Sequence, residues 1–252
     1  MSKIQIKITS SVNGGICVSW PDGKKVWVDL YPEEKTRSFS YLTDAQWDLV
    51  KCDPRFLPPA MILATHTHPD HFSAARTKEA AALWPDAEIV FPEDKIYSMI
   101  TGITDSDGIP GTRVSGPEAV IEKCGITAKY FRTVHSGKKY VDTPHYSILL
   151  SYMDRNILIS GDAAVADEQN IELFSRIPCD IAVLNFPWAS LRSAREVVVN
   201  SIRASHVLLT HIPNKEDNID GYREMSRTGA ALLDIPDVRL MLYQFREEIF
   251  NI

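Results

Sequence analysis

AMILATHTHPDH, at residues 60–71, places an apolar run directly before three histidines and an aspartate. The apolar half predicts a buried strand that delivers its carboxyl end to a loop. On a strand, His66 and His68 would point the same way, as a shared metal ion requires. Asp70 and His71 follow the turn at Pro69, so their side chains can face a second metal position. Because imidazole is the commonest metal ligand among side chains, this stretch predicts a metal site.

The spacing His-x-His-x-Asp-His after a buried strand resembles the signature of the metallo-β-lactamase-fold hydrolases. That family completes a dinuclear site with a later His, an Asp in a Gly-Asp pair after a strand, and a final His. The chain has matching residues in this order. The resemblance implies two metal ions. The first would be bound by His66, His68 and His135 and the second by Asp70, His71 and His211, with Asp162 bridging both.

The number of candidate ligands also favours two ions. One catalytic zinc takes about three protein ligands and leaves a position for water, so the full set is too large for one ion. We therefore expect two divalent metal ions; the family favours zinc, and the same ligand types suit manganese or iron. A hydroxide between the metals is the expected nucleophile, because coordination lowers the pKa of water toward about 7. Asp70 is the expected catalytic residue, which orients this hydroxide or passes on its proton.

Three of these assignments have alternatives. Asp162 could instead cap the helix that follows it, because Asp is a favoured cap residue. His211 could be a structural histidine at the end of a buried strand. His145 could replace His135; we prefer His135, which directly follows the strand predicted at 127–134.

A second group of residues is expected around the metals. His145, Tyr146 and Trp188 are candidate substrate-binding residues. The lysine pair at 138–139 could meet an anionic group of the substrate, although a solvated loop is the simpler interpretation. The segment 100–116 has the composition of a loop and could cover the site as a lid.

Composition and charge limit the class of protein. The chain has 252 residues, of which 44% are hydrophobic and 24% charged, and no linker or repeat divides it, so we expect one domain over 1–252. The net charge of -6 gives no electrostatic reason to expect nucleic acid as a partner. No apolar run approaches the roughly 20 residues of a membrane span, and no signal peptide is evident. Together with four widely spaced cysteines, these features predict a cytoplasmic protein with a small-molecule substrate, which could form a homo-oligomer.

The order of predicted elements fits one architecture. The sequence predicts strands at 3–9, 15–20, 25–30, 119–122, 127–134, 146–153, 156–160, 181–185, 207–210 and 237–244. It predicts helices at 41–52, 73–84, 167–175, 190–203 and 218–232. The first of these helices carries Thr43 and Gln46 as a capping box. This order fits the α/β class and the four-layer αββα sandwich that the resemblance implies.

The leading hypothesis is a metal-dependent hydrolase that uses the metal-bound hydroxide on a small ester, lactone or phosphodiester. One alternative is a nuclease-like phosphodiesterase acting on RNA, but such relatives need a basic substrate arm that this acidic chain lacks. Another alternative is a non-hydrolytic metal-binding or redox member of the same fold. The diiron relatives carry Glu where this chain has His68, which disfavours that alternative.

Overall fold

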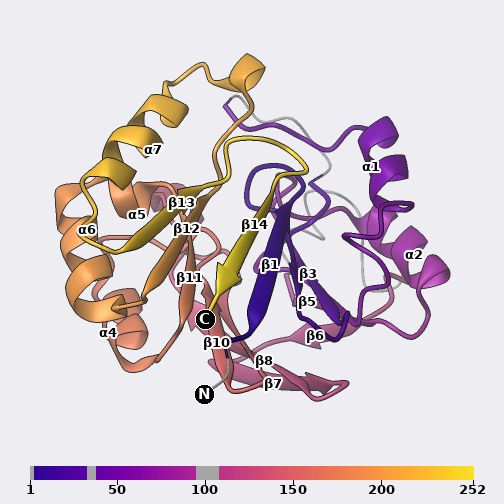
Figure 1. Cartoon of the computed structure of the whole chain (residues 1–252). Coiled ribbons are helices and arrows are strands. Elements are labelled where there is room, and N and C mark those ends of the chain that lie inside the picture. Colours follow the sequence, from indigo (N-terminus) through magenta and orange to yellow (C-terminus); the bar gives the residue numbers. More distant parts are fainter. Residues whose placement is uncertain (1–2, 33–37, 95–107) are drawn as a thin grey trace.

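Two β-sheets packed face to face form the centre of the protein. The computed structural model describes residues 3–32, 38–94 and 108–252. Within these ranges each sheet has seven strands (Figure 1). The first sheet runs in the order β14 (Glu247–Asn251), β1 (Gln5–Ser10), β2 (Ile16–Ser19), β3 (Lys25–Val28), β4 (Met61–Leu63), β5 (Glu88–Pro92) and β6 (Thr112–Val114). The second runs in the order β13 (Asp237–Leu240), β12 (His206–Thr210), β11 (Ile181–Asn185), β10 (Arg155–Ile159), β9 (His145–Tyr152), β8 (Ile126–Thr133) and β7 (Glu118–Lys123).

Helices cover the outer face of each sheet (Figure 1). The first sheet is covered by α1 (Asp44–Val50) and α2 (Ala74–Leu83). The second is covered by α4 (Glu168–Arg176), α5 (Pro187–Ser190), α6 (Arg192–Val197) and α7 (Tyr222–Ala231). The result is the four-layer αββα sandwich predicted from the sequence. No helix in the described ranges has both the length and the apolar character needed to cross a membrane.

The burial pattern of the strands explains why both sheets are covered. In β12, Leu208 packs into the core between the sheets, whereas Val207 and Leu209 pack into the core beneath the helices. All three side chains are fully buried. Strands buried on both faces have continuous apolar sequences, and β12 has one at 207–209.

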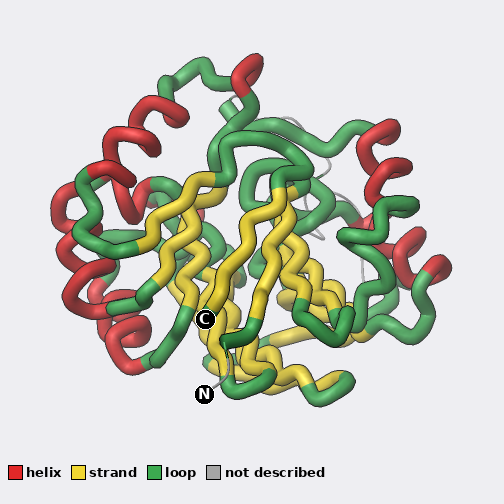
Figure 2. Tube along the Cα trace, viewed as in Figure 1, coloured by secondary structure: helices red, strands yellow, loops and turns green. Residues whose placement is uncertain are grey.

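Pairing within each sheet brings several strand ends to one place. In the first sheet, β3, β4, β5 and β6 pair in parallel. In the second, β10, β11, β12 and β13 pair in parallel, and the strands before them are antiparallel. Loops and turns close both ends of the sandwich (Figure 2). The loops at the carboxyl ends of the parallel strands carry the candidate ligands.

Several elements differ from the prediction, which ended the strand at 237–244 later than β13 does and contained no strand for β14. The helix predicted at 190–203 begins only at Arg192, as α6, and continues into a π-helical segment at 198–202; the extended backbone of Leu191, with φ -90° and ψ 136°, separates it from α5. The helix predicted at 218–232 begins only at Tyr222. Within the lid expected at 100–116, the last residues form β6, which pairs with β5, and the lid residues before 108 lie outside the described part of the chain.

Candidate metal centre

The seven predicted ligands lie together at one end of the sandwich. Four come from the loop after β4 in the first sheet, and three follow β8, β10 and β12 in the second; they are His66, His68, Asp70, His71, His135, Asp162 and His211. The loop after β4 turns back at once, because the backbone N–H of His71 donates to the carbonyl oxygen of His68 at 2.9 Å. The centre therefore lies between the two sheets and takes side chains from both.

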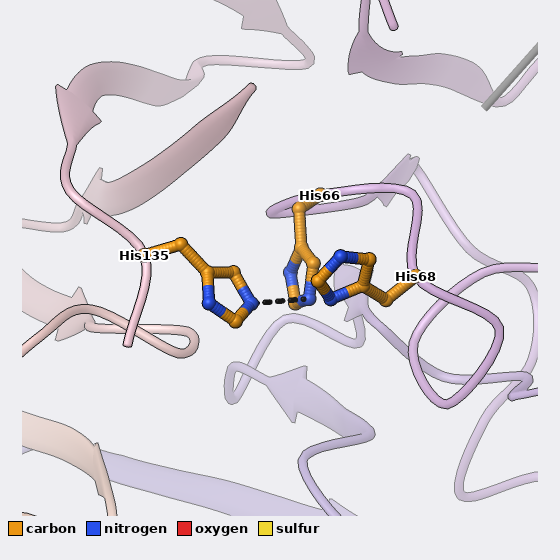
Figure 3. Close-up of side chains that lie close together, drawn as sticks. All are labelled: His66, His68 and His135. Atoms are coloured by element: carbon orange, nitrogen blue, oxygen red, sulfur yellow. Dashed lines mark hydrogen bonds between the residues drawn. The ribbon is translucent and has the colours of Figure 1, made fainter. Parts of the chain in front are cut away.

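The first group of ligands is made of three imidazoles. His66, His68 and His135 each offer a ring nitrogen, and these atoms all lie within 4.8 Å of one another. The Nε2 atoms of His66 and His135 are 3.3 Å apart and face each other, with His68 beside them (Figure 3). The Nδ1–H of His135 donates to the carbonyl oxygen of Ser136 at 2.6 Å, which leaves the lone pair on Nε2 for a metal.

The second group consists of Asp70, His71 and His211, whose donor atoms also lie within 4.8 Å of one another. The Nε2 atoms of His71 and His211 are 2.9 Å apart. The Nε2 atom of His211 is 3.6 Å from Asp70 Oδ2. The structure thus places these three residues around a second point, as the resemblance implies.

Asp162 lies between the two groups. Its Oδ2 atom is 3.5 Å from the Nε2 atoms of both His71 and His211 and 3.9 Å from His135 Nε2. Asp167, not Asp162, caps the helix that follows, because the Asp167 side chain accepts the Asn170 N–H. The Asp162 carboxylate is therefore left to face the imidazoles.

The donor set and its spacing fit a pair of divalent ions. Two ligand atoms about 2.1 Å from a tetrahedral ion lie roughly 3.4 Å apart. The Nε2 and Oδ2 atoms of the cluster lie 2.9 to 3.9 Å apart, which spans that distance. Imidazole nitrogen and carboxylate oxygen are ligands for zinc, manganese and iron.

The electrostatics of the first group also suit a cation. Burial, together with the neighbouring imidazoles, holds the pKa of His66 well below its ordinary value. The same causes lower the pKa of His68 to about 4, and burial lowers the pKa of His135. All three imidazoles are therefore neutral at pH 7, which is the form that binds a metal.

Around Asp162 and His71 the carboxylates and imidazoles stabilise each other's charges. Burial alone would raise the pKa of Asp162, but His211 and His71 outweigh it and hold that pKa well below its usual range. Burial alone would lower the pKa of His71, but Asp162 and Asp29 outweigh it and raise that pKa well above its ordinary value. A metal at this point would displace the proton from His71, since ligands must give up protons to bind.

Asp29, which sequence analysis missed, supports the second group. Its Oδ2 atom accepts the Nδ1–H of His71 at 3.0 Å, so His71 turns Nε2 toward the cluster. Its two oxygens also accept the Thr65 N–H at 2.8 Å and the Thr65 hydroxyl at 2.7 Å. Asp29 groups with His66 and His71 in space, but these bonds occupy its carboxylate, so it acts as a supporting residue. No signal in the sequence marked it, because Asp29 lies within the strand predicted at 25–30, which in the structure ends at Val28.

His145 lies beside the centre without facing it as a ligand. Its Nε2 accepts the backbone N–H of Asp162 at 2.8 Å, so Nδ1 carries the proton and donates to the Thr133 hydroxyl at 2.7 Å. Burial holds the pKa of His145 well below its ordinary value, so the ring stays neutral. No lone pair is left for a metal, and this geometry favours His135 over His145 as the third ligand of the first group.

Two expected substrate-binding residues lie elsewhere. Tyr146 is fully buried in the core between the sheets, and its hydroxyl donates to the carbonyl oxygen of Gly116 at 2.8 Å. Trp188 is fully buried in the core beneath the helices, where its ring packs on Phe174. Neither side chain lines the cavity above the candidate ligands, because each is enclosed by its core. His145 is also fully buried, so none of the three expected substrate-binding residues lines that cavity.

A cavity of about 650 Å³ lies above the metal ligands. Its floor includes His68, Asp70, His135, Asp162 and His211. Its walls are formed by Phe39, Thr67, Pro69, Asp94, Ser136, Lys139, Tyr140, Asp142, Thr143, Asn185, Phe186, Pro187 and Tyr222. The volume is in the range of sites that hold small ligands.

Comparison with solved structures gives the same architecture. The metallo hydrolase Igni18 from the archaeon Ignicoccus hospitalis has 16% identity and a TM-score of 0.65 over 98% of this chain and 99% of its own. The isothiocyanate hydrolase from Delia radicum gut bacteria has 19% identity and a TM-score of 0.63 over 97% and 99%. YhfI from Bacillus subtilis, a metallo-β-lactamase-fold protein, has 13% identity and a TM-score of 0.59 over the whole of both chains.

Sequence comparison adds nothing to this. No protein-family profile matches the chain, and no curated protein matches it in sequence. The structural likeness extends over essentially the full length of the chain, and the His-x-His-x-Asp-His loop stands after a strand of the first sheet. The protein therefore has the metallo-β-lactamase fold.

Proposed function

We propose that the protein is a metal-dependent hydrolase of small ester, lactone or phosphodiester substrates. The observation that carries this proposal is the convergence of seven donor side chains from both sheets, five of which line the floor of one cavity. Burying this many imidazoles and carboxylates together costs more free energy than burying apolar residues would, so the cluster indicates a function other than stability. The solved structures named above as hydrolases support the proposal through the shared fold.

The proposed centre holds two divalent ions, and zinc is the metal we expect. Asp162 supports a pair, because its carboxylate faces ligands of both groups. Bound ions would supply a nucleophile at neutral pH by lowering the pKa of water, and they would polarise the scissile bond. Asp70, next to His211 at 3.6 Å, is placed to orient the attacking group and to take up its proton.

The charge of the cavity wall favours a small substrate over RNA. Among the described lining residues, Lys139 is the only lysine or arginine, whereas Asp94 and Asp142 add carboxylates beyond those of the ligands. A nuclease gains most of its affinity from cations that neutralise phosphates. We also propose a cytoplasmic location, since the cysteines are free thiols rather than disulfides.

The test combines metal content with turnover in two variants of one strand. His211 follows the carboxyl end of β12, and His206 begins the same strand and pairs with Asp237 at 2.7 Å, remote from the centre. We expect His211→Ala to lose bound metal and more than about 100-fold of the activity, and His206→Ala to keep both. The panel contains an alkyl ester, a lactone, a phosphodiester and a short RNA, each with zinc, manganese or iron.

Two results would contradict the proposal. One is that the folded native protein and the folded His206→Ala control both take up no metal. The other is full metal content in His211→Ala together with unchanged turnover.

A further inference from the structure

The cavity above the metal ligands has one aromatic wall. Phe39, Phe186 and Tyr222 form it, and they come from the loop before α1, from the end of β11 and from the start of α7. Phe39 stacks on Tyr222 with ring centroids 5.6 Å apart, and Tyr222 packs on Phe186 at 4.7 Å. We call this set the aromatic wall.

The aromatic wall begins at the second group of ligands. The ring of Phe39 lies 4.1 Å from the imidazole of His211, measured between centroids. Phe39 and Tyr222 are only partly buried, so apolar ring surface remains open to the cavity. Apolar surface kept open inside a concave site is stabilised when a ligand covers it.

The opposite wall is polar. Tyr140 packs beside the first group, with its ring 4.7 Å from His68 and 5.2 Å from His135. Lys139 lies over the Tyr140 ring at 4.5 Å, and Thr143 completes this side with its hydroxyl 3.5 Å from His68 Nε2. A substrate that fills the cavity would therefore meet polar groups over the first ligand group and aromatic rings over the second.

We propose that the aromatic wall binds an uncharged aryl or branched alkyl group of the substrate, which makes the substrate a hydrophobic carboxylic ester or lactone. This inference rests on the proposed hydrolase function and narrows its substrate class. Two non-ligand carboxylates, Asp94 and Asp142, line the same cavity, so a substrate with additional negative charge is disfavoured. In the reaction, the oxygen of one water bonds to the carbonyl carbon and the bond from that carbon to the ester oxygen breaks. One water proton passes to the departing alkoxide and the other goes to solvent, leaving a carboxylate and an alcohol.

The first experiment measures binding without turnover. Metal-loaded protein is titrated calorimetrically with phenylacetate, acetate and phenyl phosphate, all of which carry an anionic group for the metals. Because the phenyl ring would cover the aromatic wall, we expect phenylacetate to bind at least roughly tenfold tighter than acetate. Phe39→Ala should remove most of this preference, so that the ratio of phenylacetate affinity to acetate affinity falls toward one whatever the absolute affinity for acetate. Tyr243→Ala, at an aromatic residue that is 60% exposed and outside the cavity lining, should keep the preference.

The second experiment compares turnover of methyl phenylacetate with that of methyl acetate. Phe39→Ala should raise KM for the phenyl ester and lower the ratio of its kcat/KM to that of methyl acetate. Tyr222→Leu provides a second variant that retains apolar volume, and metal analysis and circular dichroism verify that each variant is loaded and folded.

The outcomes separate this inference from the hydrolase proposal. Equal affinity for phenylacetate and acetate in fully loaded protein overturns the aromatic subsite, even if esters are hydrolysed. Tighter binding of phenyl phosphate than of phenylacetate overturns the assignment of an uncharged carboxylic substrate. A phenylacetate preference that Phe39→Ala abolishes supports the subsite even if no ester in the panel turns over.

Discussion

At the scale of single residues, Gly161 shows how tightly the centre is built. Its φ of +54° lies in the left-handed region, and a Cβ there would stand 2.8 Å from His145 Nε2 and 2.9 Å from the Thr65 hydroxyl. His145 in turn accepts the backbone N–H of Asp162. Glycine at this position therefore allows both the sharp turn and the hydrogen bond that fixes the bridging carboxylate.

This packing makes Gly161→Ala a demanding substitution. Gly23 is the matched control, because it has a φ of +87° but no heavy atom within 4 Å of the place that a Cβ would occupy. We expect Gly23→Ala to lower the free energy of unfolding by about 1 kcal/mol through backbone strain. Gly161→Ala should lower it by roughly 2 to 4 kcal/mol, because overpacking against His145 adds to the strain. Urea denaturation measures both losses. Equal losses in the two variants would show that contact with His145 and Thr65 adds nothing to the backbone strain.

The four thiols should differ in reactivity for an electrostatic reason. Burial raises the pKa of Cys17 and of Cys179 to about 12, whereas Cys52 and Cys124 are exposed. Because only the thiolate reacts, the thiols of buried Cys17 and half-buried Cys179 stay protonated and unreactive at pH 8. We expect a disulfide reagent to label two thiols rapidly in native protein and four in urea. Rapid labelling of all four in native protein would contradict this.

The sequence predicted which candidate ligands lie close together better than it predicted the residues around them. Asp70 and His71 stand in a motif whose spacing itself points to a metal, and the structure places them at the centre. Asp29 stands in no motif, and only its contact with His71 in the fold reveals its task. Tyr146 and Trp188 were expected at the cavity from residue type alone, which does not distinguish a pocket wall from a core.

At the scale of elements, α1 forms where the sequence predicted a capped helix. The Thr43 side chain accepts the Gln46 N–H at 3.3 Å, and the Gln46 side chain accepts the Thr43 N–H at 2.9 Å. This reciprocal pair satisfies two backbone donors that no helical bond reaches. Trp47 is thereby held in the aromatic cluster beneath the helix, edge to face with Trp27 at 6.1 Å.

Removal of the cap should weaken the protein without touching its centre. Thr43→Ala leaves the Gln46 N–H without its acceptor, so we expect a loss of about 1 kcal/mol in the free energy of unfolding. Thr43→Ser keeps the hydroxyl and should lose less than half of that. Metal content should be unchanged in both, and thermal denaturation gives the comparison. A serine variant as unstable as the alanine variant would show that the methyl group, rather than the hydrogen bond, stabilises this end.

Elements without a local pattern were the ones that sequence analysis missed. In β14, residues 247–251 are polar except at two positions, and Phe250 alone is fully buried. Its strand conformation comes from pairing with β1, a partner far away in the sequence. The break between α5 and α6 at Leu191 likewise has no glycine or proline at that position that would predict it.

At the scale of the whole molecule, the metal centre joins the two sheets. His66, His68, Asp70 and His71 extend from the first sheet, and His135, Asp162 and His211 extend from the second. Ions that bind this set bind only the folded arrangement. In the proposed metal-bound protein, the centre would thus cross-link the halves of the sandwich as well as provide a site for chemistry.

Chelation should therefore lower the thermal stability of the protein. At a free metal concentration about 100 times the dissociation constant, binding contributes about 2.7 kcal/mol. For a chain of this size, we expect removal of metal to lower Tm by roughly 5 to 11 °C. Asp162→Ala, which removes the bridging carboxylate, should show a smaller shift with chelator, and His206→Ala should show the full shift. A Tm that is indifferent to both zinc and chelator would argue against the cross-link.

The four-layer architecture was predicted from the family resemblance, and the order and apolar character of the strands agree with it. Apolar strand runs such as 181–185 and 207–210 are buried on both faces, which required helices outside and a second sheet inside. The aromatic wall was not predictable, because its three rings come from separate segments that only the fold brings together.

The pairing of β1 with β14, in which Gln5 lies opposite Asn251, has a consequence for biosynthesis (Figure 1). As the nascent chain leaves the ribosome, the amino-terminal sheet carries an uncovered edge along β1 until the strand that follows β13 has been made. An unpaired edge of this kind recruits foreign strands. Chains halted before residue 247 would leave β1 at the edge in place of β14, which carries glutamates at 247 and 248, and we expect them to aggregate more than the whole chain.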